Sequence, residues 1–163
     1  MKINLSKRII ILPLVAMLSS VMSINSHADE YYRPVTQQDA LVLEECGACH
    51  MAYSSEMLPA ASWQKIIANL DNHFGEDASI SPESAAQLSA FFSENAADSG
   101  WFGNRFTRGI DQNRSPIRIT ETPYWIREHY EVNPANWQNP EIKSKSNCLA
   151  CHRNAERGGY DDD

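Results

Sequence analysis

The sequence predicts a small, mainly α-helical domain of short helices and long loops. Apolar residues recur at helical spacing in several segments, whereas the alternating apolar and polar pattern of strands is scarce. Between these segments lie long stretches with glycine and proline, over residues 99–121 and 133–147, which indicate ordered loops. A chain with so much loop has a thin protein core, so its folded state needs another source of apolar volume.

Local signals mark where the predicted helices begin. Thr36 is placed to cap a helix that runs through residues 41–44 into the first cysteines of the chain. Pro59 opens a second helix. Ser81–Pro82 and Thr122–Pro123 each combine an N-cap residue with a proline at the first helical position.

Apolar periodicity predicts the buried faces of these helices. The helix that opens at Pro59 would bury Trp63, Ile66, Ile67, Leu70 and Phe74. The helix after Ser81 would bury Ala85, Leu88, Phe91 and Phe92. The helix after Thr122 reaches His129, and a last short helix is predicted over Cys148–His152, ending near Gly158–Gly159.

The most informative pattern occurs twice, as Cys46-Gly47-Ala48-Cys49-His50 and Cys148-Leu149-Ala150-Cys151-His152. A Cys-x-x-Cys-His run attaches a c-type haem, because its two thiols reach the two vinyl groups of one porphyrin and its histidine can bind the iron. The chain has 4 cysteines, and the two motifs use all of them. We therefore expect two thioether-linked haems c, around which the helices and loops wrap. A thiol–disulfide site would need a strand–helix–strand frame, which the pattern does not indicate.

The N-terminal segment has the layout of a secretory signal peptide. Lys2, Lys7 and Arg8 precede a short apolar stretch, and residues 26–28 offer a small-x-small cleavage site. We expect residues 1–28 to be removed, which leaves 29–163 as one domain exported to a bacterial periplasm, where haem is attached to such motifs. A membrane anchor is the alternative, but the apolar stretch is shorter than the roughly 20 residues that span a bilayer.

Charge narrows the choice of partners. All 21 acidic residues follow position 28 but only 11 of the 14 basic residues do, so the mature chain has a net charge of −10. Nucleic acid is therefore excluded as a partner, whereas a basic surface on another redox protein is compatible with this charge.

The histidine count predicts the remaining axial ligands. Without His27, which the signal peptide contains, the mature chain has His50, His73, His129 and His152. His50 and His152 are the proximal ligands that their motifs set, which leaves His73 and His129 for the two open axial positions. Met51 and Met57 are the competing thioether ligands. Met51 adjoins His50 on its proximal side and cannot easily reach the distal face of the same haem. Met57 is the better candidate of the two, but its sequence context is also that of a packing residue.

Ligation of both irons by two histidines has a functional consequence. A second imidazole gives a lower reduction potential than a thioether, and filled axial positions leave no site for a substrate. The expected role is electron transfer rather than enzymatic catalysis. The alternative is a haem enzyme or small-ligand sensor in which one iron is five-coordinate.

Four arginines lie in the long loop of this acidic chain, at positions 105, 108, 114 and 118. A planar guanidinium suits a carboxylate, so one or more of them could pair with haem propionates. Arg118 is the favoured candidate because it lies closest in sequence to the His129 helix. A solvated basic loop is the alternative.

Several segments together resemble the dihaem cytochrome c family of small bacterial periplasmic proteins. The resemblance is carried by residues 46–50, 58–60, 62–63, 70–76, 118–124, 128–129, 148–152 and 155–156. It implies one mostly helical domain with two low-spin haems, and His73 and His129 as distal ligands. It also implies a membrane b-type cytochrome as electron donor and a soluble cytochrome or other periplasmic redox protein as acceptor. We expect a monomer. Short separation favours His73 for the haem at Cys46, and a crossed arrangement remains open.

Overall fold

Four α-helices and seven short 3₁₀ turns form the described part of the chain, which in this computed structural model is residues 40–101, 103–111 and 113–160. The helices are α1 (Ala40–Cys46), α2 (Ala60–Ile67), α3 (Pro82–Asn95) and α4 (Pro123–Glu128). The turns are η2 (Ser55–Met57), η3 (Leu70–Asn72), η4 (Arg105–Thr107), η5 (Ile119–Glu121), η6 (Asn136–Gln138), η7 (Cys148–Ala150) and η8 (Ala155–Arg157). The predicted signal peptide, Thr36 and the cleavage site lie outside the described residues.

The described residues contain no strand, so the mainly α fold class is confirmed. None of the helices among them is long and apolar enough to cross a membrane.

Capping explains where α3 and α4 begin. The Ser81 hydroxyl accepts a hydrogen bond from the Ser84 amide at 3.0 Å, and the Thr122 hydroxyl accepts one from the Trp125 amide at 3.2 Å. A proline occupies the first turn of both helices, where the missing N–H costs nothing. Both predicted helix starts are therefore confirmed.

The helix predicted to run from Pro59 to Phe74 is shorter than its apolar pattern indicated. α2 ends at Ile67, where the Asn69 side chain donates a hydrogen bond to the Lys65 carbonyl at 2.7 Å. Such side-chain bonds to the backbone compete with helix continuation. The chain then bends through η3, and Phe74, which was predicted to be buried, is 44% exposed.

The prediction of a short helix over Cys148–His152 is also wrong, because the segment does not form an α-helix. This segment forms the 3₁₀ turn η7, and a second 3₁₀ turn, η8, follows it. The predicted stop near Gly158 is confirmed, because Gly158 closes η8 with a φ of 85°. Short 3₁₀ turns let the chain change direction within a few residues, which a regular helix over the same residues would not allow.

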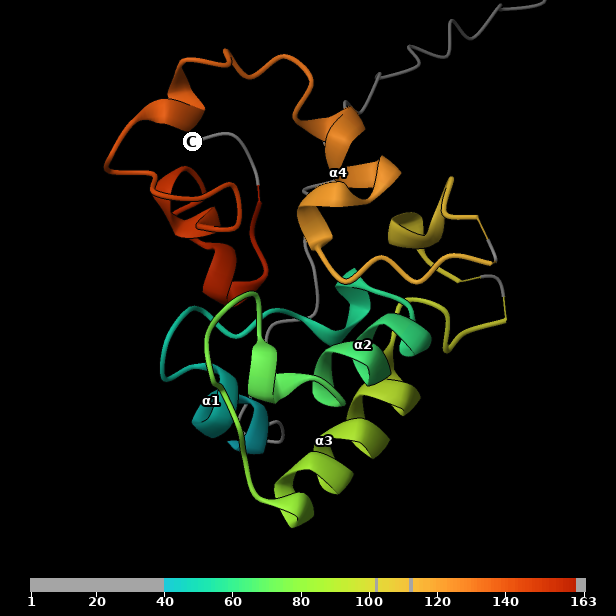
Figure 1. Cartoon of the computed structure of the whole chain (residues 1–163). Coiled ribbons are helices and arrows are strands. Elements are labelled where there is room, and N and C mark those ends of the chain that lie inside the picture. The colour runs from blue at the N-terminus through green and yellow to red at the C-terminus, as the bar shows by residue number, and fades with distance from the viewer. Residues whose placement is uncertain (1–39, 102, 112, 161–163) are drawn as a thin grey trace, which may run out of the picture.

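The main core lies where α2 packs on α3, and α1 also contacts α3 (Figure 1). Its buried members are Val42, Leu58, Trp63, Leu88, Phe92 and Ala96. The Trp63 and Phe92 rings stack with centroids 4.3 Å apart, and the Trp63 indole N–H donates to the Ser55 carbonyl at 2.8 Å. The predicted buried face of α3 is thus confirmed at Leu88 and Phe92, while Ala85 and Phe91 are half-buried.

A second core cluster joins this helical body to α4. It consists of Met57, Ala97, Phe106 and Tyr124, with the Phe106 and Tyr124 rings meeting edge to face at 4.9 Å. Figure 1 shows α1, α2 and α3 in one half of the molecule, and α4 with the orange-to-red C-terminal segment in the other. The cluster therefore fixes α4 in position beside the segment that carries the second cysteine motif.

Ser62 is a weak point in the main core. Its side chain is 0% exposed, and its hydroxyl has no hydrogen-bond partner among the described residues. We predict that Ser62→Ala raises the free energy of unfolding by about 1 kcal/mol, because an unsatisfied buried hydroxyl is removed and alanine is the better helix former. Denaturant unfolding measures this. Ser89→Ala, in α3, is the control for helix propensity, and a gain no larger than in this control would contradict the prediction.

Tyr53 ties the two halves together. Its hydroxyl donates a hydrogen bond to the Ser146 carbonyl at 2.7 Å, across 93 residues of sequence. We predict that Tyr53→Phe lowers the free energy of unfolding by about 1 kcal/mol, the typical net value of one hydrogen bond. Tyr130→Phe is the matched control, because that side chain is 73% exposed and bonds only to its neighbour Glu131. Equal stability of the two variants would show that the Tyr53 bond contributes nothing.

Candidate haem sites

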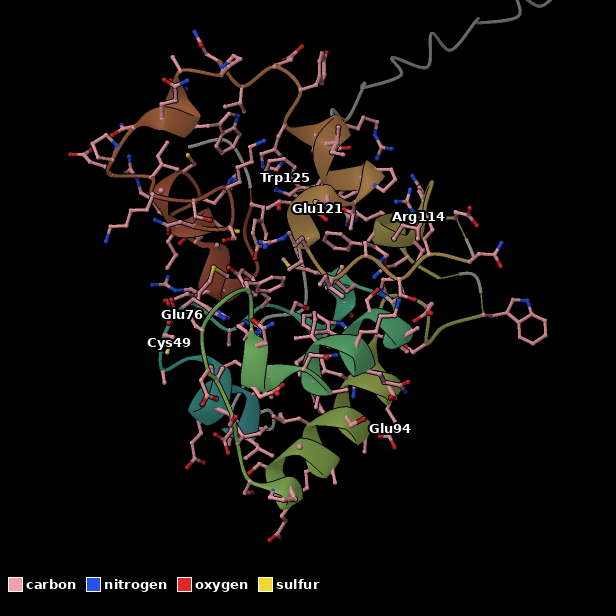
Figure 2. All side chains as sticks on the ribbon, viewed as in Figure 1. Cys49, Glu76, Glu94, Arg114, Glu121 and Trp125 are labelled. Atoms are coloured by element: carbon pink, nitrogen blue, oxygen red, sulfur yellow. The ribbon has the colours of Figure 1, made fainter. Side chains whose placement is uncertain are left out.

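The first cysteine motif begins at the last residue of α1. The Gly47 amide donates a hydrogen bond to the Leu43 carbonyl at 3.0 Å, which extends the last turn of α1 past Cys46. A Cβ at position 47 would collide with the Leu43 carbonyl oxygen, so this turn requires glycine. Cys49 and His50 follow at the surface, and Figure 2 shows Cys49 at the edge of the molecule, away from the α2–α3 core.

A strained turn presents His73 to the same site. The His73 and Glu76 backbones exchange two hydrogen bonds, at 2.7 and 3.2 Å, around Phe74 and Gly75. Both central residues have positive φ, 58° at Phe74 and 104° at Gly75, as in a two-residue hairpin turn. Phenylalanine rarely adopts this conformation, at a cost on the order of 1 kcal/mol. The surrounding structure holds the strained turn in place and fixes where the His73 ring lies.

The first histidine pair lies across a narrow gap. The His50 and His73 ring centroids are 6.2 Å apart, with 22° between the ring planes. Burial lowers the pKa of His73, and the nearby His50 and Arg118 lower it further. The neutral imidazole, which is the form that ligates a metal, is therefore favoured at His73.

The second pair is built from α4 and the C-terminal segment. His129 caps the C-terminus of α4, and His152 follows η7, where its amide bonds to the Cys148 carbonyl at 2.8 Å. The two ring centroids are 6.1 Å apart, and the ring planes lie at 88° to each other. Both histidines of this pair therefore belong to the half of the molecule formed by α4 and the C-terminal segment.

Hydrogen bonds define the proton positions on two of the four rings. His50 Nδ1 lies 2.7 Å from the Met51 carbonyl oxygen, and His129 Nδ1 lies 2.9 Å from the Trp125 carbonyl oxygen. Because a carbonyl oxygen only accepts, Nδ1 carries the proton in both rings. Nε2 is then left with a free lone pair, which is the usual arrangement for a metal-ligating histidine.

A cavity of about 340 Å³ lies at the second site. Its lining includes both thiols of the second motif together with His129 and His152. Its other walls are largely apolar and aromatic, formed by Met57, Phe106, Ile119, Tyr124, Trp125, Val132, Trp137 and Tyr160. A more open cavity of about 580 Å³ lies beside Cys49 and His50 and is lined by Leu43, by residues 47–52 and by Glu156, whereas His73 and Cys46 are not part of its lining.

The separations between the paired histidine rings fit a haem at each site. With an iron about 2 Å from each ligating nitrogen, and each nitrogen about 1.1 Å from its ring centroid, two axial imidazole centroids lie about 6.2 Å apart. The two measured separations are 6.2 and 6.1 Å. The structure therefore brings His73 to His50 and His129 to His152, the uncrossed arrangement. Met57 is buried in the second core cluster.

Cys46 and Cys148 lack the features of a reactive thiol, and no disulfide joins the four cysteines of the described residues. Burial, with a contribution from Glu45, raises the pKa of Cys46 to about 11, and burial likewise raises the pKa of Cys148 to about 11. A reactive thiol needs a lowered pKa, so these cysteines are poor nucleophiles for disulfide exchange. Within the described ranges, no group of three or more histidine, cysteine or acidic side chains forms a metal site.

Arg118 reaches the first site from the N-terminus of η5, the turn that precedes α4. Its guanidinium stacks 4.0 Å above the Phe74 ring, and its Nε forms an exposed ion pair with Glu121 at 3.5 Å. Pairing of Arg118 with a propionate stays a prediction, now for the haem at Cys46.

Sequence reasoning missed the aromatic residues that surround the histidines. Tyr53 stacks on His50 at 5.0 Å and, through its bond to Ser146, also reaches the second motif. Trp125 stacks on His129 at 4.1 Å, and Figure 2 shows it on α4. Trp125 is four residues before His129, so helical spacing was a usable signal, whereas nothing in the sequence pointed to Trp137.

Solved structures of similar proteins share this fold. A dihaem cytochrome c from Rhodobacter sphaeroides is 46% identical, with a TM-score of 0.72 over 78% of this chain and 99% of that one. One from Shewanella baltica OS155 is 37% identical, with a TM-score of 0.62 over 76% of this chain and 88% of that one. No curated protein gives a significant match.

The family model for dihaem cytochrome c matches residues 42–160, a range that includes both cysteine motifs and both histidine pairs. Membership implies two covalently bound haems c, for which Cys46, Cys49, Cys148 and Cys151 provide the thiols. The match spans most of the chain and agrees with the fold and with the identities to solved relatives. The chain therefore belongs to the dihaem cytochrome c family.

Proposed function

We propose that this protein is a periplasmic electron carrier in which His50 with His73, and His129 with His152, ligate two low-spin irons. The observation that carries the proposal is the spacing of the two ring pairs, 6.2 and 6.1 Å between centroids. Two pairs from four different segments share the one separation that a six-coordinate iron requires. Each pair also joins the histidine of a Cys-x-x-Cys-His motif to a histidine outside the motifs, as ligation of two irons would require.

Filled axial positions decide between a carrier and an enzyme. When bound, the haem irons supply one-electron chemistry by cycling between the ferric and ferrous states. With an imidazole on each side, the chain leaves no open position where a substrate could be activated. The protein residues then hold the ring planes, exclude water and adjust the potential.

Tyr53 supports exchange between the two sites. Its ring stacks on His50, and its hydroxyl bonds to the carbonyl of Ser146, the same carbonyl that accepts the Cys148 amide at 3.0 Å. A short chain of contacts therefore runs from the proximal ligand of the first site to the first thiol of the second. This connection supports the proposal that the two sites act as one relay.

The partners follow from charge and family. We propose a membrane b-type cytochrome as donor and a soluble cytochrome or other redox protein of the periplasm as acceptor. The mature chain carries 21 acidic and 11 basic residues, so a basic docking face on a partner would speed encounter at low salt. The chain would act as a monomer after removal of residues 1–28.

Removing one distal histidine tests the ligand set. We predict that His73→Ala or His129→Ala converts about one haem per protein from low to high spin, because the sixth position is vacated. Each variant should then bind about one carbon monoxide in its ferrous form, measured by optical titration against an unreactive wild type.

The exposed Tyr130→Phe variant serves as the control, since it should retain the wild-type spectrum and bind no carbon monoxide. If either histidine variant kept the wild-type spectrum, that histidine would not be a ligand. Carbon monoxide binding by the wild type would favour an open iron and overturn the carrier proposal.

Loss of the second haem should unfold one half of the molecule. Of residues 129–160, only Ile142 and Ala155 are buried hydrophobic side chains, so the bound group supplies most of the apolar contact there. We predict that a Cys148→Ser/Cys151→Ser variant loses amide protection over this segment and keeps it in α2 and α3, as measured by hydrogen exchange with mass spectrometry.

The reciprocal Cys46→Ser/Cys49→Ser variant is the control, because its second site remains complete. Protection of residues 129–160 should survive in it. Unchanged protection in both variants would mean that the protein folds without its haems.

A further inference from the structure

The two histidine pairs have the same spacing but different orientations. The rings of His50 and His73 are close to parallel, at 22°, whereas those of His129 and His152 are close to perpendicular, at 88°. If both pairs ligate iron, the two sites have identical ligands and differ in how the planes are rotated about the axis through the metal.

Two indole rings hold His129 in its crosswise position. Trp125 stacks on it face to face, with centroids 4.1 Å apart and planes only 12° from parallel. Trp137 lies on the same side of His129 as Trp125, with its centroid 6.3 Å from the His129 ring and 5.7 Å from the Trp125 ring, so it backs the stacked indole. The bond from Nδ1 to the Trp125 carbonyl fixes the remaining rotation. The ring of His129 therefore cannot turn without displacing a tryptophan.

Plane orientation changes the electronic structure of a ferric haem. Each axial imidazole donates from one π orbital, perpendicular to its ring, into one of two iron d orbitals. Two parallel rings both donate into the same iron d orbital, which separates the energies of the two d orbitals and stabilises the ferric state. Two perpendicular rings donate into different d orbitals, so the two d orbitals stay nearly equal in energy and the ferric state loses this stabilisation. A crosswise pair therefore has the higher reduction potential when the ligands are otherwise the same.

The surroundings of the second site also raise the reduction potential expected for the haem at Cys148. Its cavity is lined by buried apolar side chains, Met57 and Phe106 among them, which disfavour the extra positive charge of a ferric site. The Lys145 ammonium lies 5.8 Å from the Trp125 ring centroid and also lines the cavity. Glu128 lines it too, but Arg127 forms an ion pair with that carboxylate at 2.9 Å.

We propose that the haem at Cys148 is the higher-potential site and takes the first electron, and that Trp125 is the positioning residue responsible, acting through the ring plane of His129. The inference rests on the proposed ligation by the two histidine pairs. Electrons arriving from a donor would then settle at the site formed by α4 and the C-terminal segment.

A potentiometric titration of the holoprotein followed by low-temperature EPR tests this. Dithionite supplies one electron to each site, which takes its iron from ferric to ferrous. The oxidised protein should show two low-spin signals of about equal intensity. A rhombic signal is expected from the near-parallel pair, and a highly anisotropic one, with a larger maximum g value, from the crosswise pair. The highly anisotropic signal should disappear first as the potential is lowered.

The Trp125→Leu variant removes the stacked indole and keeps the backbone carbonyl that His129 Nδ1 contacts. It should lose the highly anisotropic signal in favour of a second rhombic one, and the two sites should then be reduced closer together. Trp101→Leu is the matched control, because that indole is 92% exposed, and it should leave both signals unchanged. Retention of the anisotropic signal in Trp125→Leu would overturn the role of Trp125.

The ligand variants assign the signals independently of the tryptophan substitution. His129→Ala should abolish the anisotropic signal and His73→Ala the rhombic one, and the reverse would overturn the proposal. Two rhombic signals in the wild type, or loss of the rhombic signal first, would also overturn it while leaving ligation by both histidine pairs intact. A high-spin signal in the oxidised wild type would instead show that the proposed function itself fails.

Discussion

The separation between two pairs of imidazole rings is the constraint on which the proposed ligation depends. For that ligation each pair needs a gap close to 6 Å, and each draws its two rings from segments far apart in the sequence. His50 precedes α2 in the chain and His73 follows it, while His129 comes from the end of α4 and His152 from the C-terminal segment. The packing of the helices serves to keep these gaps open and correctly sized.

The protein core is unevenly distributed around the two gaps. α1, α2 and α3 enclose a conventional apolar cluster with Trp63 and Phe92 stacked at its centre. The segment after α4 has almost no apolar core of its own and depends on 3₁₀ turns and on the contact through Tyr53. Such an arrangement suits a small chain whose cofactors supply apolar volume, because a domain of this size buries limited surface by itself.

Local strain and aromatic packing are concentrated at the histidines. Phe74 adopts a left-handed conformation in the turn that presents His73, and Trp125 stacks on His129 from one turn earlier in α4. Both features restrict a ring that would otherwise rotate freely. Restriction of this kind reduces the reorganisation that accompanies a change of charge at the metal, which favours electron transfer over ligand exchange.

The sequence by itself determined the features whose causes are local. The two Cys-x-x-Cys-His motifs specify haem attachment within five residues each, the caps at Ser81 and Thr122 specify where α3 and α4 begin, and the histidine count specifies the candidate ligands. Only the tertiary structure decided which histidines face each other, where Arg118 lies and how the ring planes are turned. Apolar spacing also overstated the helix after Pro59, because a polar side-chain bond at Asn69 competes with the helix there. Motifs and caps act through neighbours in the chain, whereas facing pairs and ring angles depend on packing between distant segments, which no local pattern encodes.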